Sequence, residues 1–313
     1  MLDLTDDWVW DFWTVDDGSS YHLFFLKAPR SLGNPDLRHW NASVGHAVSD
    51  DLRQWVRVDD ALHPQPRPAF DDLATWTGSA VRAGDGTWLT FSTGLSSGDE
   101  GLVQRLGVSS SDDLVGWRRD PRALLEADER WYAVRGPSVR ETHWRDPWVE
   151  RAADGRWHMY VTSRAAGTGS AVVGHASSPD LLDWEVHPPL SPPSRRFTWA
   201  EVISLHRLEG RWVLLFSCLS PEMVGAAPGA GGVWAVPVGG PGAPVDLDRA
   251  TRVTSEDLYV GKLVRLRDGS SRFLAFENRD AAGRFSGGVI DPVRVEWRGD
   301  RLGLLDVPER WQP

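Results

Sequence analysis

The chain has 313 residues, of which 41% are hydrophobic and 25% charged, and this is ordinary for a globular protein that buries a core. Its formal net charge of −10 argues against nucleic acid as a partner, because phosphate binding requires a basic surface. The sequence shows no membrane-spanning apolar run and no secretion signal in its opening MLDLTDDWVW. These two observations lead us to expect a cytoplasmic protein, and the single cysteine, Cys218, which excludes an internal disulfide, fits a reducing compartment.

One repeating unit extends along the chain. It consists of a short apolar strand, an acidic residue followed by glycine, and a second apolar strand. Asp-Gly between two apolar runs is a strong signal for a β-hairpin. The turn glycines lie between 55 and 69 residues apart. The five turns are Asp17-Gly18, Asp85-Gly86, Asp154-Gly155, Glu209-Gly210 and Asp268-Gly269.

A third apolar strand is expected after each hairpin. These strands are expected at 43–49, 105–111, 171–178, 231–238 and 287–293. Three of them run into a shared tag, SDDLRQW, SDDLVGW or SPDLLDW, which predicts a turn into a fourth, outer strand with its Trp at the blade edge. Five such units predict an all-β fold, a five-bladed β-propeller that forms a single domain over residues 1–313. A two-sheet sandwich is the alternative, but it does not explain the repeat.

Three acidic residues are expected to begin the first strand of their hairpins. Asp11 precedes its turn glycine by seven residues, and Asp146 and Glu201 precede theirs by nine. The first strand of a propeller blade lines the central channel, so we expect the three side chains to converge at one mouth of it. Glycoside hydrolysis requires one carboxylic acid and one carboxylate, and a third carboxylate can bind sugar hydroxyls. The alternative is that one of the three is a surface carboxylate.

Four motifs resemble the fructan-active clan of five-bladed propellers, which comprises the invertase or β-fructofuranosidase family and the levansucrase family. They are Arg145-Asp146-Pro147, the WTGSA segment at 76–80, the GHAVS segment at 45–49 and the YHLF segment at 21–24. The resemblance implies that Asp11 is the nucleophile, that Glu201 is the general acid/base, and that Asp146 binds two hydroxyls of the furanose ring. It also implies a retaining reaction on sucrose or fructo-oligosaccharides, by hydrolysis or by fructosyl transfer.

The same resemblance implies further residues that bind the sugar. Arg145 would bind the sugar and hold the neighbouring carboxylates, and Trp76 and Ser79 would line the pocket. Trp10 precedes Asp11 in a Val-Trp-Asp sequence similar to that of levansucrases. Trp199, two residues before Glu201, would either stack on the sugar or wedge between blades.

Several positions depart from the pattern of invertases. The sequence around Asp11 lacks their Asn-Asp-Pro-Asn-Gly motif, and Val202 stands where a Cys usually follows the acid/base. The fifth blade is expected to end near Trp297, which leaves no room for the C-terminal β-sandwich of invertases. We therefore expect a divergent member of the clan.

Two other functions remain open. The first is an inverting arabinanase or xylosidase-like propeller, although Ala200-Glu201-Val202 differs from the Glu-Gly-Pro expected there. The second is a propeller that binds sugar without cleaving it. No spacing typical of metal ligands is visible, so we expect neither a metal nor a cofactor, and we expect a small carbohydrate as the partner.

Overall fold

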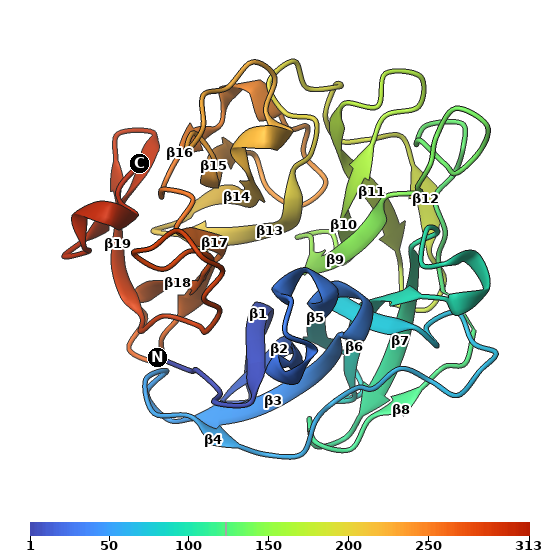
Figure 1. Ribbon diagram of the computed structural model, residues 1–313, viewed down its shortest axis with the longest axis horizontal. Helices are drawn as coiled ribbons and strands as arrows, with labels where there is room; N and C mark the ends of the chain where they lie inside the picture. The colour runs from blue at the N-terminus through green and yellow to red at the C-terminus, as the bar shows by residue number, and fades with distance from the viewer. Residues whose placement is uncertain (123) are drawn as a thin grey trace.

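The computed structural model describes residues 1–122 and 124–313. They form five four-stranded antiparallel sheets arranged around a central axis (Figure 1). In each sheet the strands follow one another in chain order, from the innermost strand at the axis to the outermost at the rim. The prediction of an all-β five-bladed propeller is therefore confirmed.

Each blade contributes four strands, ordered from the innermost outward. They are β1 (Asp7–Asp16), β2 (Tyr21–Pro29), β3 (Ser43–Ser49) and β4 (Val56–Arg57) in blade 1; β5 (Ala74–Arg82), β6 (Trp88–Leu95), β7 (Arg105–Ser111) and β8 (Arg118–Arg119) in blade 2; β9 (Trp144–Arg151), β10 (Trp157–Arg164), β11 (Ala171–Ser178) and β12 (Glu185–His187) in blade 3; β13 (Glu201–Leu208), β14 (Arg211–Cys218), β15 (Gly232–Val238) and β16 (Thr251–Arg252) in blade 4; and β17 (Leu258–Arg265), β18 (Ser271–Glu277), β19 (Val293–Arg298) and β20 (Arg301–Leu305) in blade 5.

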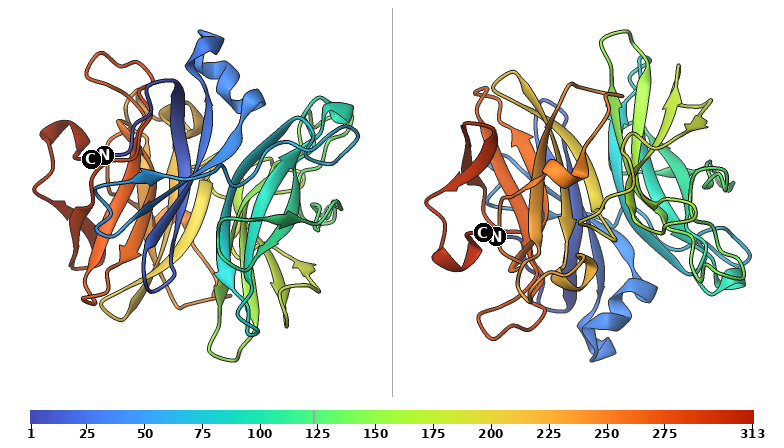
Figure 2. Two further views of the ribbon diagram at one scale, coloured as in Figure 1. Left: turned by 90° about the horizontal axis from the view of Figure 1, so that it is seen from below. Right: turned by 90° about the horizontal axis from the view of Figure 1, so that it is seen from above.

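Short 3-10 helices occupy several loops. They are η1 (Arg30–Leu32), η2 (Pro35–Asn41), η3 (Ser97–Asp99), η4 (Ser220–Glu222), η5 (Leu247–Arg249) and η6 (Glu309–Trp311). The η2 segment, drawn in blue, projects from one face of the propeller (Figure 2). In the described part of the chain, no helix is long and apolar enough to cross a membrane.

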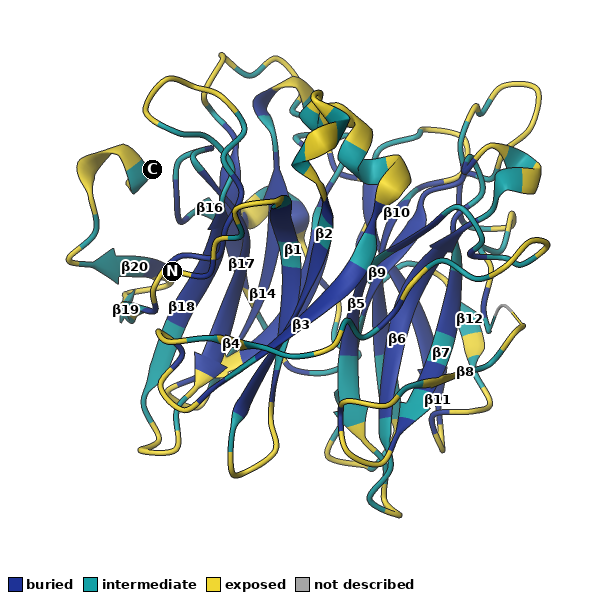
Figure 3. Ribbon diagram, turned by 60° about the horizontal axis from the view of Figure 1, so that its bottom comes forward, coloured by how far each residue is buried: buried dark blue, intermediate teal, exposed yellow. Residues whose placement is uncertain are grey.

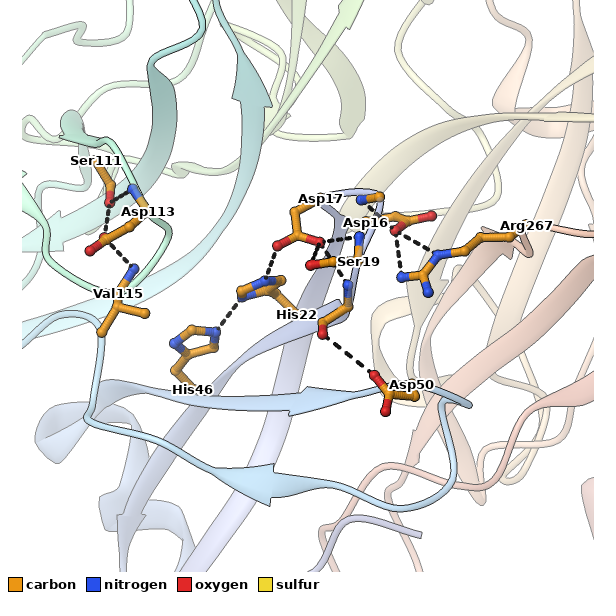
Figure 4. Close-up of polar contacts among 12 residues, drawn as sticks. Asp16, Asp17, Ser19, His22, His46, Asp50, Ser111, Asp113, Val115 and Arg267 are labelled. Carbon is orange, nitrogen blue, oxygen red and sulfur yellow. Dashed lines mark hydrogen bonds and ion pairs between the residues drawn. The ribbon is translucent and has the colours of Figure 1, made fainter.

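The Asp-Gly turns form as the sequence predicts. In blade 1, Gly18 has a φ of +94°, a conformation that favours glycine. The Asp17 carboxylate accepts the backbone N–H groups of Ser19 at 2.6 Å and Ser20 at 2.7 Å (Figure 4). It also contacts His22, whose Nδ1 lies 2.9 Å from Nε2 of His46 on β3. The aspartate therefore closes the turn and orients a histidine pair inside the blade.

The shared tag is a side-chain-capped turn that leads into the outer strand. In blade 2, Oδ1 of Asp113 accepts N–H groups of Val115 and Gly116, and Ser111 donates its hydroxyl to the same carboxylate (Figure 4). The tag tryptophan of blade 2 also contacts the neighbouring blade. The ring of Trp117 packs edge-on against Phe24 of blade 1, with ring centroids 5.7 Å apart. This tag thereby helps to join neighbouring blades.

The third strand of blade 5 differs from the prediction. The sequence predicts it at 287–293, but regular pairing begins only at Val293. The earlier part runs beside the end of β18 through isolated bridges, such as the one between Phe276 and Val289. Gly287 and Gly288 have positive φ values, and Pro292 lacks an N–H group, so the segment cannot continue a regular ladder.

The N-terminal segment closes the ring. Leu2 donates its N–H to the Val289 carbonyl at 2.9 Å and accepts the Val289 N–H at 2.8 Å. Both chain ends lie beside blade 5 (Figure 1). Because β1 follows directly after this segment, the bridge ties the first blade to the last. The inner strands are largely buried, whereas the loops at the two faces are exposed (Figure 3).

Candidate active site

A pocket of about 310 Å³ opens at the axis, where the inner strands meet. Asp11, Asp146 and Glu201 all line it, as expected from the sequence. Residues of blade 2, blade 5 and the η2 segment complete the wall. Three carboxyl groups that are far apart in sequence are therefore together in one pocket.

An irregularity in the inner strands turns these side chains toward the pocket. In every blade, the inner strand contains an extra residue relative to its partner at about the same depth, which makes a β-bulge. The first bulged residue adopts a positive φ in three blades: Asp146 at +59°, Val202 at +51° and Val260 at +54°. Such values are strained for residues other than glycine. These three strained residues lie where the pocket is built.

The three acids do not share one position in the repeat, and the prediction that all of them begin their strands was wrong, since only Glu201 does. Glu201 pairs with Ser217 just before its bulge, the position that Arg145 occupies opposite Thr162 in blade 3. Asp146 is the first bulged residue of blade 3, and Asp11 is the second bulged residue of blade 1. The equal spacing to the turn glycines was misleading, because the hairpin loop is longer in blade 3 than in blade 4.

Asp11 is held from the neighbouring blade. Thr77 on β5 donates its hydroxyl to Oδ2 of Asp11 at 2.5 Å. Burial raises the pKa of Asp11 to about 7, and the nearby Asp146 acts in the same direction. The Thr77 hydrogen bond and the more distant Arg38 favour the ionised form.

Arg145 connects the other two acids. Its Nε lies 3.4 Å from Oδ2 of Asp146, and its Nη2 forms an ion pair with Oε1 of Glu201. Its Nη1 contacts Oε1 of Gln104 at 3.2 Å and Nδ1 of His143 at 2.6 Å. Although burial disfavours the charged form, Glu201 and Asp146 raise the pKa of Arg145. The guanidinium therefore fixes the relative position of the two carboxyl groups.

Asp146 and Glu201 have further partners that set their orientation. The backbone N–H of Asp146 donates to Oγ1 of Thr93 at 2.9 Å, and Oδ2 of Asp146 accepts the Val202 N–H at 3.3 Å. Burial raises the pKa of Asp146, whereas Arg145 acts against this. Tyr259, on the inner strand of blade 5, donates its hydroxyl to Oε2 of Glu201 at 2.6 Å. Both oxygens of Glu201 are thus held.

A fourth carboxyl group lies close to Glu201. Glu222 of η4 lines the pocket, and its Oε2 accepts the Leu219 N–H at 2.9 Å. Burial raises the pKa of Glu222, and the charge of Glu201 adds to this effect. Both effects favour the protonated form of Glu222, which can donate a hydrogen bond in the pocket.

The aromatic residues expected from the sequence line the pocket. Trp10, Trp76 and Trp199 all contribute to its wall. Trp76 donates its Nε1–H to the His39 carbonyl at 2.6 Å, which fixes the ring against η2. The Cζ atom of Arg145 lies over the Trp199 ring, 5.4 Å from the ring centroid. Trp199 is half-buried in the pocket wall, so it is available to contact a ligand.

Ser79 does not line the pocket, and its predicted role was wrong. Its side chain is 3% exposed, and its Oγ accepts the Val149 N–H of blade 3 at 3.2 Å. Thr77 faces the pocket instead, because it is the extra residue at the bulge between Trp76 and Gly78. Ser79 lies beyond the bulge and joins blades 2 and 3.

Sequence reasoning missed several pocket residues. Thr77 lies within the recognised WTGSA segment, so the motif itself pointed to it. Tyr259 precedes the Val260-Gly261 pair that marks the bulge of blade 5. The η2 residues Arg38 and His39 had no signal in the sequence, since the connection between the second and third strands is as long in blade 4 and longer in blade 5.

Among the residues that the structure describes, no group of three or more His, Cys, Asp or Glu side chains is arranged to hold a metal ion. The polar groups of the pocket instead form a hydrogen-bonded network around three carboxyl groups. Such an arrangement is suited to acid/base and nucleophilic chemistry on a polar substrate.

The fold and the site define a five-bladed β-propeller with three carboxyl groups in its axial pocket, an arrangement typical of glycoside hydrolases. Residues 14–230 match the N-terminal domain of the glycosyl hydrolases family 32, and the chain belongs to this family. The matched range includes Asp146 and Glu201 but begins after Asp11. The position of Asp11 in the pocket is therefore known from the structure alone.

Relatives with similar sequences agree with this assignment. The chain is 31% identical over 172 residues to the acid beta-fructofuranosidase AIV-18 of Capsicum annuum, covering 53% of this chain and 24% of the relative. It is 33% identical over 130 residues to beta-fructofuranosidase 1 of Zea mays, covering 41% and 17%. The chain thus matches a quarter or less of the length of these two relatives.

The fold is shared along nearly the whole chain. The inulosucrase from Halalkalicoccus jeotgali bound to kestose superposes with a TM-score of 0.75 at 22% identity, covering 97% of this chain and 89% of that one. The fructan 1-exohydrolase IIa from Cichorium intybus gives a TM-score of 0.71 at 17% identity, covering 98% and 59%. At these identities the likeness shows a common fold.

Proposed function

We propose that the protein cleaves β-fructofuranosides with retention of configuration, with Asp11 as nucleophile and Glu201 as general acid/base. The observation that carries this proposal is the convergence of Asp11, Asp146 and Glu201 in one pocket of a family 32 propeller. Arg145 joins Asp146 to Glu201, and Thr77 holds Asp11. Each carboxyl group thus has a different environment, as separate roles require.

The proposed reaction has two steps. Glu201 protonates the leaving-group oxygen while the Asp11 carboxylate attacks the anomeric carbon, and a covalent fructosyl-enzyme forms. Glu201 then takes a proton from water or from a second sugar, which attacks the same carbon and releases Asp11. Asp146 accepts hydrogen bonds from furanose hydroxyls. The Tyr259 and Arg145 contacts support this role for Glu201, because they hold its carboxyl group in one orientation.

The charge of the pocket favours a neutral substrate. Two arginines and five carboxyl residues line it, namely Arg38, Arg145, Asp11, Glu141, Asp146, Glu201 and Glu222. Such an excess of acidic groups disfavours a phosphorylated sugar. One structural neighbour is an inulosucrase bound to kestose and another a levansucrase complexed with sucrose. Sucrose or a short fructo-oligosaccharide is therefore the proposed substrate.

A substrate screen tests the proposal. The purified protein is incubated with an aryl β-fructofuranoside, sucrose, inulin, levan and aryl arabinofuranosides, and the products are separated by chromatography. We expect fructose from at least one fructoside and none with Asp11→Asn. Oligosaccharides at high sucrose concentration would show transfer. The anomeric configuration of the first product, followed by NMR, separates retention from inversion.

Two results would overturn the proposal. Release of arabinose with no release of fructose would support the inverting arabinanase-like function. Binding of fructosides in calorimetry without cleavage of any of them would support a non-catalytic sugar-binding propeller. A cytoplasmic location and a single domain over residues 1–313 stay predictions, and the relatives include a cell wall isozyme of Zea mays.

A further inference from the structure

Arg38 of η2 is a charged residue that the pocket keeps largely out of water. It belongs to the pocket wall, and its side chain is 12% exposed. Burial lowers the pKa of Arg38 to about 10, so its guanidinium stays charged at neutral pH. A charged group with so little exposure usually has a close ion-pair partner. Among the described residues, only Asp36 forms an ion pair with it, at 4.0 Å from Nη1, and the Asp36 side chain is 89% exposed. Such a solvated pair contributes little.

Aromatic rings hold the guanidinium instead. The Cζ atom of Arg38 lies 3.9 Å from the ring centroid of Phe285, in the loop that follows β18, and 5.6 Å from that of Trp10 on β1. A cation over an aromatic face is stabilised by the charge distribution of the ring. These contacts fix the position of the guanidinium, but aromatic rings accept few of its N–H groups.

Most N–H groups of Arg38 have no acceptor in the protein. Within residues 1–122 and 124–313, the guanidinium donates one hydrogen bond, from Nη1 to the Pro35 carbonyl at 2.9 Å. Nε is buried without an acceptor. Nη2 has no acceptor among these residues either, but the protein does not enclose it, and so it is open to a ligand in the pocket.

The two arginines of the pocket therefore differ in what they can offer to a ligand. The Arg145 guanidinium is occupied by Asp146, Glu201 and Gln104. Arg38 has lost most of its contact with water and has gained one hydrogen bond in return. A ligand oxygen that accepts from Arg38 would restore part of the hydrogen bonding that it lost on folding.

The η2 segment holds Arg38 in place before any ligand binds. It is the blue coil beside β1 and β5 (Figure 1). The His39 carbonyl accepts the Nε1–H of Trp76 at 2.6 Å, and the His39 ring packs edge-on against Trp10 and Trp76. Because the neighbouring residue is fixed on two inner strands, little conformational freedom of η2 remains to be lost on binding.

The place of Arg38 in the pocket determines which part of a substrate it meets. Trp10 immediately precedes Asp11 on β1, so Arg38 packs on the strand that carries the proposed nucleophile. Glu201 is held on blade 4 by Arg145. In a retaining reaction the nucleophile attacks the anomeric carbon of the sugar that stays bound, whereas the acid protonates the leaving oxygen. We therefore expect Arg38 to meet the fructosyl unit and not the leaving group.

We propose that Arg38 is a substrate-binding residue whose guanidinium donates hydrogen bonds to hydroxyl groups of the fructosyl unit. The proposal rests on the proposed function, because it concerns the sugar that Asp11 attacks. Hydrogen bonds from a charged donor are stronger than those between neutral groups, and the low exposure of Arg38 reduces their screening by water. Arg38 thus contributes to the selection of fructosides.

A binding experiment tests the proposal without turnover. Methyl β-D-fructofuranoside carries the fructosyl unit on a minimal leaving group, and its affinity for Asp11→Asn is measured by calorimetry. Adding Arg38→Met removes the donors and keeps a side chain that packs on Phe285. We expect the affinity to fall about tenfold or more. An equal affinity with and without Arg38→Met would overturn the proposal.

Arg57→Met in the same background is the matched control. Arg57 also has a buried Nε without an acceptor among the described residues, and its Cζ lies 5.0 Å from the ring centroid of Phe25. It lies on the outer strand β4, however, and does not line the pocket. The Arg57→Met variant should keep the affinity. An equal loss in both variants would assign the effect to packing and contradict a role of Arg38 in binding.

Two comparisons of ligands identify what Arg38 binds. In the protein with Asp11 intact, Arg38→Met should lower kcat/KM by a similar factor for sucrose and for an aryl β-fructofuranoside, because both carry the fructosyl unit. A loss confined to sucrose would place Arg38 at the leaving sugar and overturn the assignment. Fructose 6-phosphate binding more tightly than methyl β-D-fructofuranoside, and only when Arg38 is present, would assign Arg38 to an anion and also overturn it.

The remaining outcomes separate this proposal from the proposed function. If wild type cleaves no fructoside but Asp11→Asn binds methyl β-D-fructofuranoside through Arg38, the proposed function fails and the role of Arg38 stands. If wild type neither cleaves nor binds fructosides, both fail. If cleavage is seen without measurable binding to Asp11→Asn, the kinetic comparison decides. If Arg38→Met does not fold, as judged by circular dichroism, Arg38→Lys replaces it. That variant keeps the charge but not the fork of donors, and an unchanged affinity in it would contradict the proposal.

Discussion

The Thr77 hydroxyl of blade 2 lies 2.5 Å from Oδ2 of Asp11 in blade 1. The two residues are held on different inner strands, so the hydrogen bond forms only when the blades assemble. It is the closest polar contact of the proposed nucleophile and opposes the rise in pKa that burial causes.

Thr77→Val removes this hydroxyl with little change in side-chain volume. The pKa of Asp11 should rise further above about 7, so the ionised form should appear only at higher pH. We expect the acid limb of kcat/KM to move up, with a loss of about tenfold at pH 6 and a smaller loss at pH 8. Initial rates across the pH range measure this.

Ser79→Ala is the matched control for that variant. Ser79 lies two residues further along the same strand, but its hydroxyl accepts from Val149 instead of facing the pocket. The variant should lose about 1 kcal/mol of unfolding free energy and keep its pH profile. A shifted profile in Ser79→Ala, or none in Thr77→Val, would contradict the assignment of Thr77 to Asp11.

Tyr259→Phe should lower kcat about tenfold with little change in KM, because Oε2 of Glu201 loses the donor that orients it. Steady-state kinetics on a cleaved fructoside measure both constants. Tyr160→Phe serves as control, since its hydroxyl accepts the Gly242 N–H elsewhere in the structure. Equal losses of kcat in the two variants would point to a general packing effect.

Arg145→Lys should lower kcat/KM about 100-fold or more, even though the charge is kept. A lysine cannot replace the planar fork that contacts Asp146, Glu201 and Gln104 together. Kinetics and a thermal melt should be measured on the same preparation. Full activity with an unchanged melting temperature would show that the fork is not needed.

Acid should destabilise the folded chain through its buried histidines. Burial lowers the pKa of His46 and of His175 from 6.5 to about 3, so both are neutral in the native state. The unfolded chain binds these protons below about pH 6.5, and stability is therefore lost as the pH falls. Each should cost up to about 2 kcal/mol between pH 7 and pH 5.

Urea unfolding of His46→Gln and wild type at both pH values checks this. The glutamine does not titrate, so the variant should lose less stability between pH 7 and pH 5 than wild type does. An equal loss in the two proteins would assign the acid sensitivity to other groups.

Much of the fold could be predicted because its signals are local. An Asp-Gly turn such as Asp17-Gly18 specifies a hairpin through its own hydrogen bonds and backbone angles. The tag around Asp113 specifies the next turn in the same way. The strand predicted at 287–293 was wrong for two reasons. Gly287, Gly288 and Pro292 interrupt the ladder locally, and Val289 pairs with Leu2 at the opposite end of the chain.

The sequence by itself determined the five-bladed repeat, the turns and the candidate acids Asp11, Asp146 and Glu201. Only the tertiary structure decided how they act together. The three acids reach the pocket from three different positions around a bulge, and the bulge places Thr77, not Ser79, beside Asp11. A bulge is a mismatch between two paired strands, and variable hairpin loops hide it from any count along one chain.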